Sequence, residues 1–465
     1  MRRYKTQKIN AVRVALVFML LTSAPAWAET ANTAPPEGTA IPSAPTVTMA
    51  AASVSRKVTF REYLQAVEQN SLDLQSQREN VTSAQAGVSI AGVRPDPQLT
   101  AGIDSKELYG PNKPNASTAT TAGIAITLET AGKHGKRIRA AESNVKLTEA
   151  NVGDFMRQLD LDSASAFVEA CRTQEALARK QSSLQSFQAV VHANETRFKV
   201  GDIGMLELRQ SRVEADRFAA DVTSAGADAS AALINLSGLL GKRFDAVFPE
   251  GAVDCELKKE PFRFELDDLI RQALENRNDV RVAKAAVENA QANLDLTRAN
   301  RWIDPVVNVG LINTPRVNPV YDGAGAVTNS PAERSQTLGL TVTIPIPFSR
   351  LQRGELIQAG TASRQARLQL DSILLKADTD VRATYTQYEA AAKNVASYSE
   401  HVLSDADNVL DGKRTGYRLG AASLLDLLEA QRTADDVYLS YLQSLADLAN
   451  ATVRLQLSAG MRPAL

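Results

Sequence analysis

Two long segments of this chain repeat each other, and the duplication constrains the fold more than any other feature of the sequence. The clearest match aligns residues 198–208 (FKVGDIGMLEL) with residues 417–427 (YRLGAASLLDL), a shift of 219 positions. Three further matches follow in the same order: 60–74 with 266–280, 96–97 with 304–305, and 123–128 with 339–344. Solenoid repeats span about 20–50 residues, so this period predicts a duplicated half-protein instead. We place the halves at 56–250 and 251–465, each with the order helix, strand, strand, long helix, helix.

The N-terminus has the three regions of a secretory signal peptide. Basic residues precede the apolar run 14–21 (VALVFMLL), and the sequence AWA at 26–28 supplies small residues at a cleavage position. We predict a cleaved signal over residues 1–28, with a soluble N-terminal helix as the alternative. No cysteine follows the cut, so lipid attachment there is not expected. Residues 29–55 are rich in Ala, Thr, Pro and Ser without apolar periodicity, and are predicted to be a flexible leader.

The charge balance excludes one class of partner. Signal cleavage removes five basic residues and no acidic ones, which leaves 47 basic against 53 acidic residues, a net charge of about −6. A chain with this balance is not expected to bind nucleic acid. After the signal, no apolar run is long enough to cross a bilayer as a helix. The mature chain is therefore expected either to be soluble in an exported compartment or to span a membrane as β-strands.

The chain offers few residues for metal binding or catalysis. His134, His192 and His401 are scattered, and the sequence has no P-loop, GxSxG, HExxH or Cys-x-x-Cys motif. We therefore expect no metal site, no cofactor and no enzymatic activity. Cys171 and Cys255 lie outside any close-spaced motif, so a disulfide in an oxidising compartment and two unpaired thiols both remain open.

Heptad spacing and the absence of proline predict two very long helices. Pro is absent from about 136–200 and from about 350–419, so each stretch is predicted as one helix of about 65 residues, about 100 Å long. The seam positions are 177, 184, 187, 191 and 198 in the first half, and 381, 385, 388, 392, 395, 399, 402, 406 and 409 in the second. Helices of about 35 residues are predicted at 60–93, 205–240, 266–301 and 424–458. Two of these end to end match one long helix, so each half is expected to form two parallel rods; an elongated coiled coil without a pore is the alternative.

Alternation between apolar and small or polar residues marks four predicted strands, at 99–104, 124–128, 307–311 and 338–344. The pattern is typical both of transmembrane β-barrel strands and of half-buried hairpins in soluble proteins. The Gly-, Pro- and Asn-rich connections 106–117 and 313–335 are predicted as surface loops. Four strands cannot close a barrel, and open strand edges cannot face lipid, so several copies must share one barrel. Eight strands from a dimer would enclose a filled interior, whereas twelve from a trimer leave room for a conduit.

From about 59 to 459 the chain resembles the TolC-like outer-membrane efflux channels. The resemblance rests on the duplicated order of helices and strands and on the two turns within 198–208 and 417–427. Residues 128–137 (LETAGKHGKR) look like the corresponding segment of the CzcC-type, heavy-metal branch. The resemblance implies a mixed, mainly α fold, in which a homotrimer forms a twelve-stranded transmembrane β-barrel in outer-membrane lipid and a long periplasmic α-helical barrel.

The function that this resemblance implies is a passive exit duct in the outer membrane of a Gram-negative bacterium. Its partners would be a periplasmic membrane-fusion adaptor and an inner-membrane transporter of the resistance-nodulation-division (RND) type. The cargo would be heavy-metal cations such as cobalt, zinc and cadmium. Export of drugs, or of proteins by type I secretion, is the alternative, and an exported structural coiled-coil protein is a further one.

The two turns at which the repeat is clearest are the candidate functional segments. Gly201 and Gly420 fit helix C-caps in the left-handed conformation, and Asp202 or Ser423 is expected to cap the helix that follows. The resemblance implies that these turns form the periplasmic entrance and the docking surface of the adaptor. The docking candidates lie in the segments 200–206 and 419–425, chiefly Val200, Gly201, Asp202, Ile203, Gly204 and Leu206 in the first half and Leu419, Gly420, Ala421, Ala422, Ser423 and Leu424 in the second.

Four further residues are candidates for lining and closing the entrance. Asp426 and Glu429 are three apart on one helical face, where acidic side chains in a first turn are favoured by the helix dipole and ordinarily face solvent. The resemblance implies instead an acidic ring, with six carboxylates in a trimer that attract cations. It also matches Glu207 and Tyr417 to positions that hydrogen-bond across neighbouring helices and hold the entrance closed, with ordinary packing as the alternative for Tyr417. The position of the family's basic residue in that contact is occupied by Ala422 here, so the closing contact is incomplete.

Overall fold

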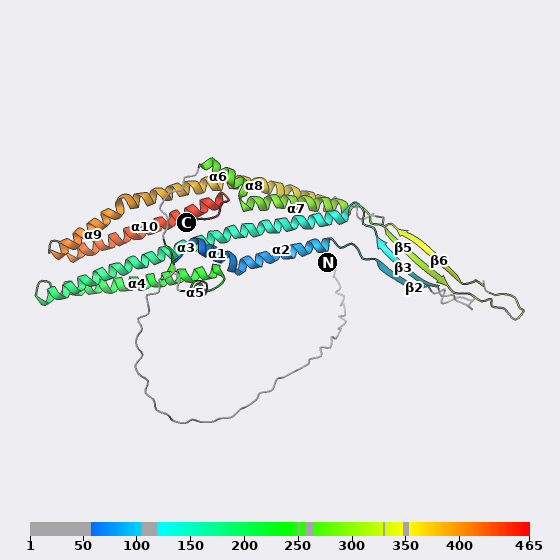
Figure 1. Cartoon of the computed structure of the whole chain (residues 1–465), viewed down its shortest axis with the longest axis horizontal. Coiled ribbons are helices and arrows are strands. Elements are labelled where there is room, and N and C mark those ends of the chain that lie inside the picture. The colour runs from blue at the N-terminus through cyan, green and yellow to red at the C-terminus, as the bar shows by residue number, and fades with distance from the viewer. Residues whose placement is uncertain (1–56, 105–118, 250–251, 256–264, 329–330, 347–352) are drawn as a thin grey trace, which may run out of the picture. The chain divides into compact units, whose positions relative to one another are not determined.

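The computed structural model describes residues 57–104, 119–249, 252–255, 265–328, 331–346 and 353–465. The predicted signal, the leader and the predicted loop 106–117 lie outside these residues. Helices run side by side through most of the described chain (Figure 1). The strands lie beyond one end of the helices, and the two glycine turns lie at the other end. The strands and the turns are therefore separated by the length of the long helices.

Each half contains the predicted order of elements. In the first half these are β1 (Lys57–Val58), α1 (Phe60–Asn70), α2 (Leu72–Ala91), β2 (Gln98–Asp104), β3 (Ala119–Thr127), α3 (Lys133–Lys199), α4 (Met205–Leu240) and a short α5 (Phe244–Val247). In the second half they are β4 (Ala252–Val253), α6 (Leu266–Asn276), α7 (Asn278–Asn300), β5 (Val306–Thr314), β6 (Ser335–Thr343), α8 (Arg353–Ser397), a π-helical turn (Tyr398–Val402), α9 (Leu403–Arg418) and α10 (Leu424–Ser458). The chain is mainly helical, with one four-stranded sheet and one two-stranded sheet.

Two of the four shorter predicted helices are broken in the middle. The prediction of single helices over 60–93 and 266–301 is wrong, because the backbone leaves the helical region at Ser71 (ψ 120°) and at Arg277 (ψ 132°). These two positions correspond to each other in the repeat. Neither break carries a Pro or Gly, so periodicity alone could not reveal them.

Side-chain contacts stabilise both breaks. Ser71 Oγ accepts a hydrogen bond from Leu74 N at 3.5 Å and so caps α2. The Arg277 guanidinium is buried and forms ion pairs with Asp279 at 2.7 Å and with Asp380 of α8 at 2.9 Å. Since a buried guanidinium must be paired, these carboxylates hold the backbone turn at Arg277 in place.

The first long helix is continuous, whereas the second contains a π-turn. α3 is one helix of 67 residues, as its seam and its lack of proline predict. The π-turn Tyr398–Val402 adds a residue to the local repeat, so the buried stripe shifts by one position beyond it. Leu410 is buried, whereas Val409 is 56% exposed and Val402 36% exposed. The predicted seam positions 402 and 409 are therefore wrong, as is position 399, where Ser399 is exposed.

The four long strands form one antiparallel sheet in the order β2-β3-β5-β6. Its centre is a row of glycines, in which Gly123 pairs with Gly310 and Gly310 with Gly339. A Cβ at Gly123 would lie 2.9 Å from Asn308 Oδ1 and 3.1 Å from Gly310 Cα, so only glycine fits at this position. The connection between β5 and β6 begins as an extended hairpin with isolated bridges at Val317–Ala332 and Tyr321–Val327.

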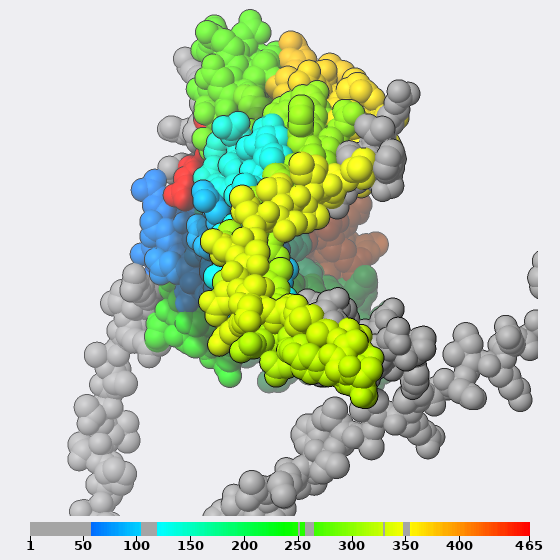
Figure 2. All heavy atoms as spheres, turned by 90° about the vertical axis from the view of Figure 1, so that its right-hand side faces the viewer, coloured from blue at the N-terminus to red at the C-terminus, as the bar shows by residue number. Residues whose placement is uncertain are grey.

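The two faces of this sheet differ in polarity. One face carries a row of apolar side chains in register across all four strands, all at least 47% exposed: Leu99, Ile124, Val309 and Leu340. The other face carries Thr100, Gly123, Gly310 and Gly339 in register. Figure 2 looks onto this end of the chain, with the yellow β6 region nearest the viewer. Among the described residues, the outer strands β2 and β6 each pair on one side only, so the sheet has two open edges.

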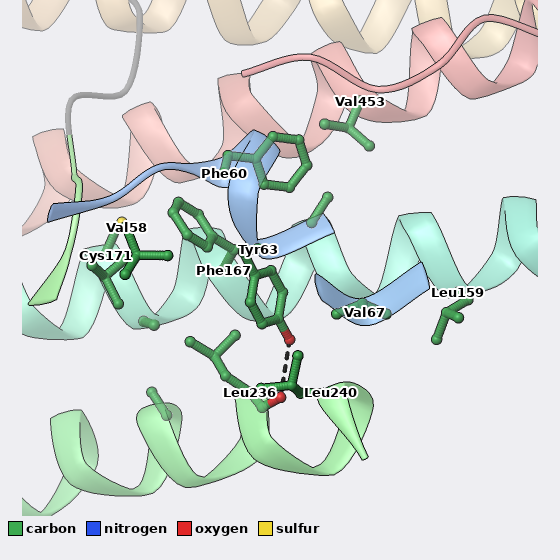
Figure 3. Close-up of a cluster of buried hydrophobic side chains, with 14 of the residues drawn as sticks. Val58, Phe60, Tyr63, Val67, Leu159, Phe167, Cys171, Leu236, Leu240 and Val453 are labelled. Carbon is green, nitrogen blue, oxygen red and sulfur yellow. Dashed lines mark hydrogen bonds between the residues drawn. The ribbon is translucent and has the colours of Figure 1, made fainter. Parts of the chain in front are cut away.

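The largest cluster of buried hydrophobic side chains joins elements of both halves. Phe60 and Tyr63 of α1 pack against Phe167 of α3, and the cluster extends to Leu236 of α4 and Val453 of α10 (Figure 3). The Tyr63 hydroxyl is buried and donates a hydrogen bond to the Leu236 carbonyl at 3.0 Å. This satisfied polar group fixes α1 against α4, because leaving it unpaired in the core would be costly. The cluster thereby holds the first and second halves together.

Candidate functional site

Both glycine turns end their long helices in the same way. Gly201 and Gly420 have φ of +81° and +76°, the left-handed conformation that glycine adopts without strain. In the first turn, Gly201 N donates to Phe198 O and Asp202 N to Arg197 O; in the second, Gly420 N donates to Tyr417 O. These are Schellman caps, as the repeated sequence predicts.

The helices that follow the turns begin differently. Ser423 caps α10 as predicted, and Ser423 with Asp426 forms a capping box. Asp202 does not cap α4: the N-cap residue is Gly204, which has no side-chain cap, and Asp202 instead pairs with Arg197 at 2.5 Å. Asp202 therefore ties the end of α3 to its own turn.

Tyr417 joins the ends of three helices. Its hydroxyl is 2.9 Å from Glu207 Oε1 at the start of α4 and 2.8 Å from Asn194 Oδ1 near the end of α3. A hydroxyl has a single proton to donate. The buried NH₂ group of Asn194 has no hydrogen-bond partner among the described residues. Rotating the Asn194 amide by about 180° lets this group donate to the Tyr417 oxygen. The hydroxyl proton of Tyr417 is then donated to Glu207. The structure thus brings the predicted pair Glu207 and Tyr417 into contact and adds Asn194.

A basic residue lies beside the contact between Tyr417 and Glu207, but it is Arg197 and not residue 422. The Arg197 guanidinium lies over the Tyr417 ring, 5.5 Å from its centroid, and also holds Asp202. Burial, followed by the hydrogen bond to Glu207, raises the pKa of Tyr417 to about 12. The phenol therefore stays protonated and able to donate at physiological pH.

Asp426 and Glu429 have different environments. Asp426 Oδ2 accepts hydrogen bonds from the hydroxyl (2.7 Å) and backbone N (3.0 Å) of Ser423, and Lys413 Nζ lies 3.1 Å from Asp426 Oδ1. The hydrogen bonds from Ser423, together with Lys413, lower the pKa of the Asp426 carboxyl to about 2. Glu429 is exposed and has no hydrogen bond or ion pair among the described residues. Within one chain, Glu429 is therefore the unneutralised acid of the two.

Some of the predicted docking residues are exposed to solvent and others are buried. Val200, Leu206 and Leu419 are 76–80% exposed, which is unusual for large apolar side chains at the end of a helical hairpin. Ile203 and Leu424 are buried, so their side chains are not open to solvent in this conformation.

Other docking candidates are also open to solvent. Gly201, Asp202, Gly204, Gly420, Ala421 and Ser423 are exposed, and Ala422 is half-buried. Leu425, the last residue of the docking segment 419–425, is 64% exposed in the first turn of α10.

A buried polar network across the two halves lies farther along α10. Asp435 Oδ1 accepts from Arg179 Nε and from Ser183 Oγ, both at 2.8 Å, and Gln431 Nε2 donates to Ser183 and to Asp435. Partners in this network are up to 256 residues apart in the sequence. It fixes the register of α3 against α10, because sliding the helices would leave a buried carboxylate unpaired.

Two features are absent from the described residues. No cluster of three or more His, Cys, Asp or Glu side chains in this part of the chain could hold a metal ion. None of the described helices combines the length and apolar character needed to cross a membrane.

Comparison with known proteins identifies the family. The family described as "Outer membrane efflux protein" matches residues 63–242 and 269–461, well over half of the chain. The chain belongs to this family. The match comes in two segments, one on each side of the junction between the halves.

Individual relatives are distant but cover most of the chain. The cobalt-zinc-cadmium resistance protein CzcC of Cupriavidus metallidurans is 22% identical over 401 residues, which span 86% of this chain and 89% of CzcC. The outer membrane protein TolC of Escherichia coli is 21% identical over 344 residues, 72% of this chain and 69% of TolC. Among solved structures, the Campylobacter jejuni CmeC outer membrane channel superposes with a TM-score of 0.69 at 14% identity, covering 87% of each chain. The protein is an outer membrane efflux channel of the TolC-like family, and not an enzyme.

Proposed function

We propose that three copies of this chain form the outer-membrane exit duct of a tripartite RND efflux system. The observation that supports this most directly is the four-stranded sheet, which has two open edges and one exposed apolar face. An unpaired strand edge is costly in lipid, so β2 of one copy must pair with β6 of the next. Three sheets then close into a twelve-stranded barrel, wide enough for a conduit.

The sheet's two faces fit the two environments of such a barrel. The row of Leu99, Ile124, Val309 and Leu340 would face lipid, and the threonine and glycine row would face the conduit. α3, and α8 with α9, then extend from the barrel as a helical tube into the periplasm. The glycine turns form the far end of this tube, where substrate enters.

At the entrance we assign closure and docking to separate residues. Tyr417, Glu207, Asn194 and Arg197 tie α9 to the α3–α4 hairpin and would hold the entrance closed. Docking of the periplasmic adaptor is assigned to the exposed apolar side chains Val200, Leu206, Leu419 and Leu425. A helical hairpin with these anchors at its tip fits an interface with a helical partner, since large apolar side chains supply most of the energy of such contacts.

We assign heavy-metal cations as cargo, with the acidic residues of α10 at the entrance as selecting groups. Two observations support this: the similarity to CzcC, named for cobalt, zinc and cadmium resistance, and the position of Asp426 and Glu429 just beyond the second turn. Because Asp426 is neutralised by Lys413 within the chain, we expect Glu429 to supply most of the cation preference.

The proposal is tested with the protein purified from outer membranes. Heat-modifiable trimers that conduct ions in planar bilayers are expected; a monomer without conductance would overturn the channel assignment. Glu429→Gln should reduce cation-over-anion selectivity more than Asp426→Asn does. Deletion of the gene should sensitise the host to cobalt, zinc or cadmium, whereas sensitivity to drugs alone would contradict the cargo assignment while leaving the channel intact.

A further inference from the structure

The chain has two cysteines, and the fold places them together. Cys171 is in the middle of α3 and is buried, and Cys255 directly follows Asp254 at the end of the segment that contains β4. They are 84 positions apart in the sequence, and Cys255 packs against the same hydrophobic cluster to which Cys171 belongs. Figure 3 shows Cys171 on α3 close to Val58 of β1, the strand with which β4 pairs.

Contacts of each sulfur link the positions of the two cysteines. Cys171 Sγ is 3.8 Å from the carbonyl oxygen of Asp254, the residue before Cys255. Cys255 Sγ is 3.9 Å from Oε1 of Gln174, which lies one helical turn after Cys171 on the same face of α3. Each sulfur therefore lies beside a residue that neighbours the other cysteine, in the chain or on the same helical face.

We propose that Cys171 and Cys255 form a structural disulfide in the exported protein. The two thiols are adjacent in the fold, and the outer-membrane family to which the chain belongs exposes its helical part to the periplasm, where disulfides form and persist. The inference depends on export of the chain and not on its transport activity, so it stands apart from the proposed function.

Oxidation proceeds by thiol–disulfide exchange with a periplasmic dithiol oxidase in its disulfide form. Cys255, the more exposed thiol, attacks one sulfur of the oxidant and forms a mixed disulfide, which releases the first oxidant thiol. Cys171 then attacks Sγ of Cys255, forms the intramolecular bond and releases the second oxidant thiol. Two protein thiols are oxidised, the oxidant disulfide is reduced to a dithiol, and the two protons leave with its sulfurs.

The surroundings of Cys171 set the order and the speed of these steps. The hydrogen bond to Cys255, followed by burial, raises the pKa of the Cys171 thiol. A thiol with a raised pKa is a poor nucleophile at neutral pH, so Cys171 is the resolving residue and its attack is the slow step.

The disulfide would stabilise the position of β4, which is otherwise held by few contacts. β1 and β4 pair through two residues each, supported by the bond from Asp254 N to Val58 O at 2.9 Å and by the ion pair Lys57–Asp254 at 3.6 Å. Bonding Cys255 to α3 closes a loop that contains the end of α3, the first glycine turn and α4. The bond would therefore staple the base of the hairpin whose tip lies at the entrance, and cross-linking a loop of this length removes much of the entropy of the unfolded chain.

The test counts free thiols in the protein as it is isolated. The full-length protein is extracted from outer membranes in excess N-ethylmaleimide without reductant, denatured in the same reagent, and analysed by mass spectrometry and peptide mapping. We expect no maleimide on either cysteine, a peptide pair that joins Cys171 to Cys255, and two maleimides per chain after reduction. Maleimide on both cysteines, or a bond that joins Cys255 residues of different chains, would overturn the proposal.

A matched variant separates the disulfide from a general effect of reductant. Reduction should lower the thermal unfolding temperature of the wild type by several degrees and leave Cys255→Ser unchanged, since that variant has no bond to lose. In Cys255→Ser, Cys171 should become alkylated only after denaturation, because it is buried. Equal shifts in the two proteins, or no shift in the wild type, would contradict the stapling role.

Discussion

At the scale of single residues, Tyr417 makes the central contacts of the proposed entrance. It is buried, it contacts Glu207, Asn194 and Arg197, and its pKa of about 12 keeps the hydroxyl proton in place. Removing that proton donor leaves Glu207 without its partner in α9, while the ring continues to fill its place. A hydrogen bond to a charged group contributes about 1.5–3 kcal/mol.

We therefore predict that Tyr417→Phe loosens the entrance without unfolding the chain. Single-channel conductance in planar bilayers should rise relative to the wild type, and the protein should still assemble. Tyr385→Phe is the matched control, because Tyr385 packs farther along α8 and has no hydrogen bond among the described residues. An unchanged conductance for Tyr417→Phe would show that this contact does not limit the opening.

Asp160 of α3 is a buried carboxyl without a hydrogen-bond partner among the described residues. It lines a cavity of about 410 Å³ together with Phe60, Glu68 and Arg462. Burial, and secondarily the negative charge of Glu68, raises its pKa to about 6, and Arg462 partly opposes this. The folded pKa lies above the ordinary value of 3.8, so the contribution of Asp160 to stability is present in full below pH ~4 and is lost as the pH rises through about 6.

Because the ionised Asp160 carboxylate destabilises the folded protein above pH ~6, we predict that Asp160→Asn stabilises the protein at neutral pH. The gain should be at most about 3 kcal/mol at pH ~8 and should vanish near pH ~4, because the amide does not titrate. Thermal unfolding followed across this pH range measures it. Asp162→Asn, at an exposed position two residues away, should change stability little at any pH. Equal pH profiles for Asp160→Asn and the wild type would mean that Asp160 is solvated or paired in the assembled protein.

At the scale of elements, the helices and strands could be predicted far better than their irregularities. The length of α3 followed from its seam and its lack of proline, and the alternation of apolar with small or polar residues located the four strands. The π-turn could not be found, because Val409 and Leu410 are both apolar and either one continues a plausible seam. Likewise, the breaks at Ser71 and Arg277 depend on partners that only the folded chain supplies.

The π-turn gives a prediction of its own. Deletion of the exposed Ser399 should convert the π-turn into regular α-helix and leave the orientation of the following residues unchanged, because the turn holds one residue more than an α-helical turn. Leu410 and Tyr417 would then stay in the buried stripe, and the contact of Tyr417 with Glu207 would be kept. Insertion of one Ala after Ser399 adds a second extra residue and should rotate the following residues by about 100°. We expect faster cleavage by a soluble protease near the second turn in the insertion variant only, with the sheet end still protected; equal cleavage of the insertion and deletion variants would contradict the role of the π-turn.

At the scale of the whole molecule, the duplication predicted the architecture but only part of the site. The duplication located both turns, and the family resemblance assigned Glu207 and Tyr417 to hydrogen bonds across neighbouring helices. Neither could supply Asn194, Arg197 or Lys413, since which side chains meet across helices depends on how the helices rotate against each other. The same holds for Asp435 and its partners on α3, which are paired only through packing.

Substitutions on the two faces of β6 test whether the sheet forms part of a trimeric barrel. Leu340 lies on the apolar face and is 70% exposed, whereas its neighbour Thr341 points to the opposite face. If the apolar face meets lipid, Leu340→Arg should cost about 2–4 kcal/mol per chain near the middle of the membrane, and a trimer pays this three times. Heat-modifiable trimers in the outer-membrane fraction should therefore disappear with Leu340→Arg and persist with Thr341→Arg, which would place its charge in the aqueous conduit. Loss of the trimers in both variants would argue for a sheet that is packed on both faces. Persistence of the trimers in both variants would argue for a sheet that stays in water. In either case the open edges of β2 and β6 would need a partner other than a neighbouring copy.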